Sequence, residues 1–247
     1  MNFPVDIPLG FVSVPAHPVF EALSILLAFK LFERLKSRRG DHLDEKGRWV
    51  SFAGAALGAL IGSRLVAALE RPDLFFSPPS WLFYVSGQSV AGAIAGGIIG
   101  AEIAKRLIGE KRRTGDLFVY PLILGIAVGR VGCFLTGVAD DTVGLPSSLP
   151  WAMDQGDGIA RHPTALYEIA VMGALAIVAR VAEKTGKLQT GDLFRIFCVG
   201  YFSWRFFVEF LKPVEAIALG LSSIQLVSAL VVIGYVLSLT RGYRKAP

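Results

Sequence analysis

Five charged residues lie inside, or at the edge of, apolar stretches that are long enough to cross a membrane. They are Arg64, Arg130, Glu168, Arg205 and Glu209. A charge near the centre of a bilayer costs roughly 2.5–3.5 kcal/mol on a lenient insertion scale, so such residues usually pair, line a wet cavity or bind a charged ligand. Arginine in particular holds phosphate through forked, charge-assisted hydrogen bonds. These residue types therefore predict chemistry on an anionic ligand at membrane depth.

The composition indicates which elements must hold these charges. Hydrophobic residues make up 53% of the 247 residues and charged residues 18%, and the mean hydropathy is +0.55. A soluble domain carries about 25% charged residues, and a spanning helix needs about 20 mostly apolar ones. We expect an all-α, polytopic membrane bundle that forms a single domain over residues 1–247. Its seven expected transmembrane helices lie at 15–35, 48–69, 81–104, 116–137, 163–182, 190–211 and 221–240.

The distribution of basic residues predicts how this bundle is oriented. Lys and Arg gather between the first and second spans, between the third and fourth, after the fifth and at the C-terminus, whereas the opposite loops balance basic against acidic residues. By the positive-inside rule the N-terminus lies outside and the C-terminus in the cytoplasm, as an odd number of spans also requires. The net charge of +5 then reflects contact with anionic lipid, and we expect no nucleic-acid partner.

Orientation converts sequence position into depth, at about 1.5 Å per helical residue. Arg130 lies about 21 Å from the cytoplasmic start of the fourth span, past the bilayer midplane, and Arg64 reaches a similar height on the second. Arg205 and Glu209 fall in the outer half of the sixth span, four residues apart on one helix face, where they can pair. Further candidates gather at the outer ends of the fifth and first spans: Arg161, His162, Tyr167, Glu168, His17 and Glu21.

We expect these side chains to converge in the outer half of the membrane. The arginines there outnumber the available carboxylates, which predicts unneutralised positive charge suited to a lipid phosphate. For any single pair, the alternative is a structural ion pair that holds a transporter-like bundle together.

Small residues and cysteines predict packing rather than chemistry. Glycines recur every four residues on the second, third and fourth spans, which indicates close packing of these helices. The glycines concerned are Gly54, Gly58, Gly62, Gly92, Gly96, Gly100, Gly125 and Gly129. Cys133 and Cys198 lie in different spans, and their spacing indicates neither a disulfide framework nor a metal site. We interpret both as small buried hydrophobic residues and expect no metal and no cofactor.

The longest expected external loop covers residues 138–162 and is rich in turn-forming residues. Loops of this length are usually functional or disordered. Trp151 and Met153 predict that the segment lies against the outer membrane interface.

Three segments, in this order along the chain, resemble motifs of the prolipoprotein diacylglyceryl transferases. Gly129–Phe134 (GRVGCF) resembles the glycine–arginine signature near the outer end of the fourth helix in that family. Arg161–Glu168 (RHPTALYE) is similar to the stretch that opens the fifth helix, and Tyr201–Phe210 (YFSWRFFVEF) resembles the sixth-helix motif. The expected number of spans and the orientation fit as well, so the resemblance covers almost the whole chain.

The resemblance implies a transferase that moves the diacylglyceryl group of phosphatidylglycerol to the cysteine thiol of a lipobox in a preprolipoprotein. It implies that Arg130 and Arg205 hold the lipid phosphate and that Glu209 orients Arg205. The implied location is the bacterial cytoplasmic (inner) membrane, which the protein crosses several times. We assign Arg130, Arg205, Glu209 and His162 to catalysis. Substrate-binding candidates are Arg64, Arg161, Tyr167 and Glu168.

The chain departs from the family pattern at polar positions. Ala91 stands where the third-helix motif has a histidine, and Cys133 replaces the asparagine after the span-four arginine. A glycine–glutamate pair becomes Gly137-Val138, with Asp140 and Asp141 slightly further on.

The thiol that attacks must lose its proton, and these departures leave the base unassigned. His162 is the best candidate because the ordinary pKa of histidine lies near neutrality. Capping of the fifth span, or a bond to a loop carbonyl, is an equally good role for it.

Three functions therefore stand beside one another. The first is the standard prolipoprotein reaction, and the second is the same lipid chemistry with a diverged acceptor. The third is a non-catalytic membrane protein that binds anionic phospholipid. A small-solute transporter is disfavoured because the charges lie on one side and no paired interrupted helices mark the midplane.

Overall fold

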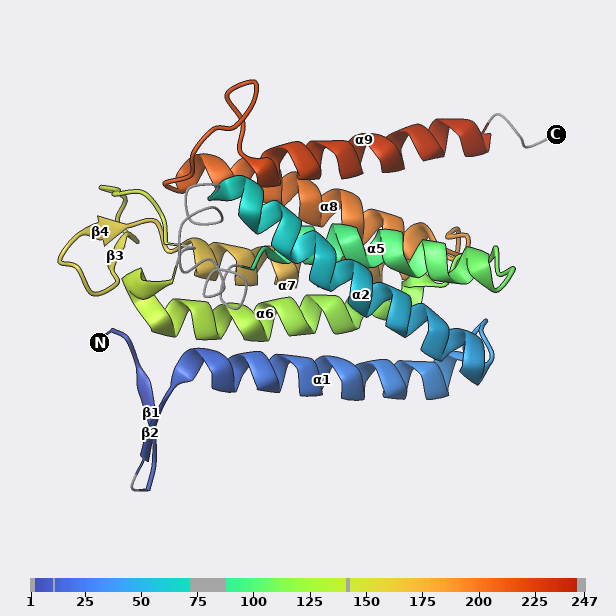
Figure 1. Ribbon diagram of the computed structural model, residues 1–247, viewed down its shortest axis with the longest axis horizontal. Coiled ribbons are helices and arrows are strands. Elements are labelled where there is room, and N and C mark those ends of the chain that lie inside the picture. Colours follow the sequence, from blue (N-terminus) through green and yellow to red (C-terminus); the bar gives the residue numbers. More distant parts are fainter. Residues whose placement is uncertain (1–2, 11, 72–87, 141–142, 244–247) are drawn as a thin grey trace. The chain divides into compact units, whose positions relative to one another are not determined.

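The computed structural model of the protein describes residues 3–10, 12–71, 88–140 and 143–243. Seven long α-helices cover most of these ranges (Figure 1), and each overlaps an expected span. They are α1 Ala16–Arg39, α2 Glu45–Glu70, α5 Val90–Leu107, α6 Val119–Thr136, α7 Thr164–Lys184, α8 Asp192–Val208 and α9 Ser223–Tyr243. Short 3-10 turns flank two of these helices. Turns η1 Gly115–Phe118 and η2 Gly137–Ala139 lie at the two ends of α6, and η3 Glu209–Leu211 follows α8. Residues 81–87 of the third expected span lie outside the described residues.

Three of the described helical stretches are long and apolar enough to cross a membrane. These are α2, the continuous stretch Gly115–Ala139 around α6, and α7. Ser223–Ser238 of α9 is a shorter apolar helix. The protein is thus a helical membrane protein, while the count of seven crossings and the orientation of the termini stay predictions.

The chain divides into two compact units, each built from several segments. The first contains Met1–Gly40, Gly115–Phe197 and Phe210–Pro213, and the second contains Asp41–Thr114, Cys198–Glu209 and Val214–Pro247. In the first unit α6 packs against both α1 and α7 (Figure 1). In the second, α2 packs along α5, and α9 contacts both of these helices.

Glycines allow α2 and α5 to approach closely, as the four-residue spacing predicts. A Cβ atom added at Gly58 would meet the carbonyl oxygen of Gly96, and one added at Gly96 would meet that of Gly58. On the fourth span the glycines face α1, a helix that the expected grouping did not include. A Cβ atom at Gly125 would touch Ala28 of α1 at 3.4 Å, because the glycine face of α6 is turned towards α1.

Two small antiparallel sheets were not expected from the all-α pattern. Strands β1 Asp6–Leu9 and β2 Val12–Pro15 form a hairpin that leads directly into α1. The amide of Val5 donates to the carbonyl of Leu135, which fastens this hairpin to the end of α6. The pairing escaped detection because a four-residue strand has too few positions to show alternation.

The second sheet folds the segment between α6 and α7. Strands β3 Met153–Asp154 and β4 Ala160–Arg161 pair, and Pro146 forms a further bridge with Arg161. The described part of the expected external loop is therefore held by backbone pairing just before α7 begins.

Candidate functional site

A buried ion pair joins α6 to α7 in the first unit. Arg130 Nε lies 2.9 Å from Glu168 Oε2, and the two side chains are only 6% and 2% exposed. Removing such charges from water costs several kcal/mol per ion, which only close, well-oriented partners offset. Glu168 therefore fixes the position of the Arg130 guanidinium.

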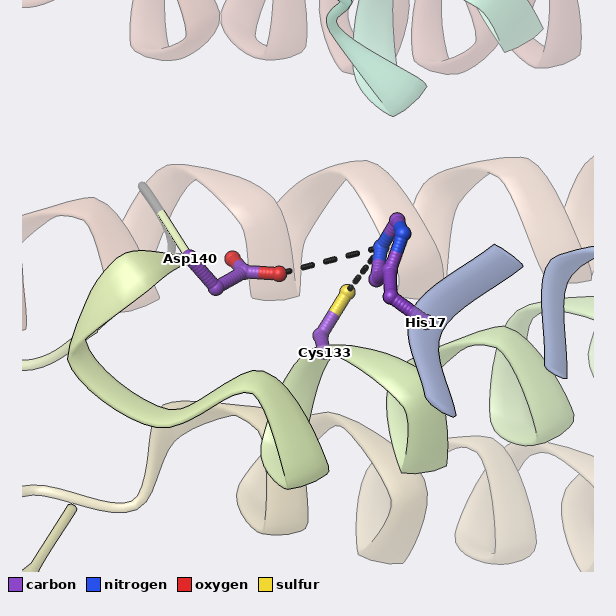
Figure 2. Close-up of side chains that lie close together, drawn as sticks. All are labelled: His17, Cys133 and Asp140. Carbon is purple, nitrogen blue, oxygen red and sulfur yellow. Dashed lines mark hydrogen bonds and ion pairs between the residues drawn. The ribbon is translucent and has the colours of Figure 1, made fainter. Parts of the chain in front are cut away.

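A cluster of three different side chains lies beside Arg130 at the same end of α6. Arg130 Nη1 donates to Cys133 Sγ at 3.5 Å. Cys133 Sγ lies 3.6 Å from His17 Nε2, and His17 Nε2 lies 3.8 Å from Asp140 Oδ2. The three residues come from α1, α6 and the position directly after η2, and their side chains point towards one another (Figure 2).

Glycine allows this cluster to form. A Cβ atom at Gly132 would lie 2.9 Å from the Cβ of Phe20 and 3.2 Å from the backbone oxygen of His17, so only glycine lets the start of α1 approach α6 here. Gly137 ends α6 with φ of +66°, a conformation that side chains with a Cβ disfavour. The 3-10 turn that follows brings Asp140 back over Cys133.

Three aromatic rings cluster at the start of α7. Trp151 Nε1 donates to the hydroxyl of Tyr167 at 2.7 Å, and that hydroxyl lies 3.3 Å from His162 Nδ1. Arg161 contacts Asp157 through Nε at 3.0 Å and Nη2 at 2.5 Å. These bonds hold the pKa of the Asp157 carboxyl below its ordinary value of 3.8.

The second unit contains the remaining candidates. Arg205 Nη2 lies 2.6 Å from Glu209 Oε1, and these side chains are 3% and 1% exposed. This confirms the pairing that their four-residue spacing predicts. Arg64 is half-buried on α2, beside Ser63, whose hydroxyl accepts a hydrogen bond from the amide of Ser89.

The expected surplus of unneutralised arginine is wrong for three residues. Arg130, Arg161 and Arg205 each have an ion pair with a carboxylate. For Arg130 and Arg205 the physical reason is that a guanidinium this buried is too costly without its counter-ion, whereas the less buried Arg161 pairs with an acid four residues before it. A phosphate would bind next to an existing pair rather than to a bare charge. Convergence of candidates from the two units stays a prediction.

The grouping of His17, Cys133 and Asp140 is the part of the site that the sequence did not predict. Cys133 follows Arg130 by three residues, so the sequence indicates that their side chains share a helix face. Its link to His17 spans 116 positions and depends on how α1 packs against α6. Cys133 is half-buried among polar groups, so its interpretation as a small buried hydrophobic residue is wrong.

The apolar helices and buried arginine–carboxylate pairs define a multi-pass helical membrane protein. A sequence model described as prolipoprotein diacylglyceryl transferase matches residues 4–241, and the chain belongs to that family. The three relatives that follow are each named phosphatidylglycerol–prolipoprotein diacylglyceryl transferase. The protein of Cupriavidus necator is 30% identical over 99% of this chain and 94% of its own length, and that of Chromobacterium violaceum is 31% identical over 98% and 96%. The protein of Bordetella parapertussis is 34% identical, but the match spans 64% of this chain and 62% of that relative.

Proposed function

We propose that this protein transfers the diacylglyceryl group of phosphatidylglycerol to the thiol of a lipobox cysteine in a preprolipoprotein. We place the reaction at the outer side of the bacterial inner membrane. The observation that carries the proposal is the family match over residues 4–241. The names of relatives that match along nearly their whole length, which state phosphatidylglycerol and a prolipoprotein, support it.

In this reaction the thiolate sulfur forms a bond to the glyceryl carbon while the bond from that carbon to the phosphate oxygen breaks. Glycerol phosphate leaves with the electron pair. Fixed cations beside the leaving phosphate stabilise the charge that develops on it. Arg130, oriented by Glu168, and Arg205, oriented by Glu209, are the proposed phosphate ligands.

The remaining candidates have proposed roles around the same lipid. We assign Arg64 and Arg161 to headgroup binding, and Tyr167 to positioning of His162, with which it shares a hydrogen bond. His162 is the candidate base.

One observation favours the alternative, a protein that binds anionic phospholipid without turnover. Ala91, which occupies the position of the family's third-helix histidine, is fully buried in α5. A methyl group there cannot donate or accept a proton. If that position is essential to turnover in relatives, this chain would keep lipid binding and lose transfer.

An assay of the purified protein with radiolabelled phosphatidylglycerol and a lipobox peptide distinguishes these functions. Transfer releases glycerol phosphate and labels the peptide in equal amounts. Release without labelled peptide would point to another acceptor, and bound lipid with neither product would point to the binder. Arg130→Ala and Arg205→Ala should each lower turnover at least ~100-fold, as loss of a single oxyanion donor does. Arg180→Ala, whose side chain is 65% exposed, is the matched control and should retain activity.

A further inference from the structure

We infer that His17, Cys133 and Asp140 form a zinc site with three protein ligands and an open fourth position. One imidazole nitrogen, one sulfur and one carboxylate oxygen all lie within 4.8 Å of one another. Thiolate, imidazole and carboxylate are the ligand types that zinc takes in proteins. Catalytic zinc sites characteristically have three such ligands, with the fourth position left for water or substrate.

The separations between the ligand atoms fit such an ion. With zinc–sulfur bonds of about 2.3 Å and zinc–nitrogen or zinc–oxygen bonds of about 2.1 Å, neighbouring ligands of a tetrahedral site lie about 3.4–3.6 Å apart. The sulfur-to-nitrogen distance is 3.6 Å and the nitrogen-to-oxygen distance is 3.8 Å. The sulfur and the carboxylate oxygen lie within 4.8 Å of each other, so rotations of the side chains would bring all three atoms around one ion.

The direction of approach favours an ion over a catalytic triad. In a Cys–His–Asp triad the carboxylate holds one ring nitrogen while the thiol meets the other. Here Asp140 and Cys133 both approach Nε2 of His17 (Figure 2). Three ligand atoms that face one point are arranged to share a cation rather than to pass a proton along a line.

The charges of the ligands and of their neighbour Arg130 are compatible with a divalent ion. A zinc thiolate and a carboxylate together offset the charge of Zn²⁺. Within the described residues, Arg130 contacts the cluster through Cys133, and its guanidinium is paired with Glu168. A hydrogen bond from Arg130 Nη1 to Cys133 Sγ is of the outer-shell kind that orients metal ligands.

The role of the open position rests on the proposed function. Zinc deprotonates a coordinating thiol outright. The acceptor thiol would bind at the fourth position and release its proton to solvent. Its sulfur would then displace glycerol phosphate from the glyceryl carbon. The ion would thereby activate the acceptor thiol, a role for which His162 is the side-chain candidate.

Metal analysis of the purified protein tests the site without reference to activity. We expect one zinc ion per chain after dialysis, and with cobalt in its place a thiolate-to-cobalt charge-transfer band. Cys133→Ser and His17→Ala should lose the ion and the band. The matched controls, Cys198→Ser at the other cysteine and His42→Ala at an exposed histidine, should keep both.

Two results would overturn the site. One is the absence of stoichiometric zinc from wild-type protein that has been supplied with it. The other is a Cys133→Ser protein that binds zinc as wild type does. Because Ser is close in size to Cys, and the melting temperature of each variant is measured alongside, a loss of metal is separated from a loss of fold.

Activity measurements then separate the inference from the function on which it rests. Chelator-treated protein should lose peptide labelling and regain it with zinc. Transfer that continues at the full rate in metal-free protein would refute the role of zinc in activating the acceptor and leave the transferase function standing. Bound zinc with a cobalt thiolate band, in a protein that shows no transfer with any acceptor, would support the site and refute the proposed function.

Discussion

At the scale of single residues, the buried ion pairs decide what the site can do. Arg130 is held by Glu168 and Arg205 by Glu209. Sequence position indicated that these residues belong together, because charges at one depth of a membrane must be offset. It predicted that Arg205 pairs with Glu209, four residues away. It did not predict that Arg130 pairs with Glu168, because that pair depends on the rotation of α6 against α7.

Breaking the Arg130–Glu168 pair should destabilise the protein. Glu168→Ala leaves a buried guanidinium without this carboxylate and should cost about 3–5 kcal/mol, whereas replacing both residues by Met and Leu should recover much of that loss. The melting temperature in detergent reports the stability of each variant. Only the double variant should combine a near-normal fold with lost lipid transfer. A Glu168→Ala protein as stable as wild type would contradict the pairing.

Acid should loosen the segment before α7. The pKa of Asp157 in the folded protein is lowered by Arg161, so this bond contributes stability above the ordinary pKa of 3.8, and the contribution is lost as the pH falls through the lower, folded value. Amide hydrogen exchange of residues 157–161, corrected for intrinsic rates, should show reduced protection on acidification. Asp157→Asn should show the reduced protection already at neutral pH. Equal protection in the two proteins at neutral pH would rule out a role for the ion pair.

At the scale of elements, the sequence predicted helices well and their partners less well. Apolar stretches of about 20 residues are a local signal, and each described long helix overlaps one of them. Contacts between helices are not local. The spacing of glycines predicted a close-packed face on α6 but not that this face meets α1, and the cluster of His17, Cys133 and Asp140 follows from that contact.

A larger residue on the glycine face of α5 should push it away from α2. Gly96→Val places side-chain atoms against the backbone of Gly58, and overpacking of this kind typically costs 1–3 kcal/mol. Thermal unfolding should show a lower melting temperature for this variant. Gly173→Ala on α7, where the added Cβ meets nothing within 4 Å, is the control and should leave stability unchanged or slightly higher. An unchanged melting temperature for Gly96→Val would argue against the close approach.

At the scale of the whole molecule, the charge bias of the loops predicts which side each end of the helices faces. This information is statistical and resides in the loops rather than in the packing of the helices. The segment before α7 is expected outside and the turn after α7 in the cytoplasm.

Labelling of single cysteines in intact cells tests this orientation. In a Cys133→Ser, Cys198→Ser background, Ser148→Cys should react with a membrane-impermeant maleimide. Lys187→Cys should react only after the cells are opened. The reverse pattern would place the candidate site on the cytoplasmic side and would remove outer-leaflet lipid as its substrate.

The central claim is that the buried arginines hold the phosphate of an anionic phospholipid. Its most direct test is the retention of phosphatidylglycerol against an excess of phosphatidylcholine by protein in nanodiscs, compared between wild type and the double variant Arg130→Met, Glu168→Leu. We predict selective retention by wild type and a loss of selectivity of at least tenfold in the variant, with its fold intact. Equal retention of phosphatidylglycerol by both proteins would contradict the account.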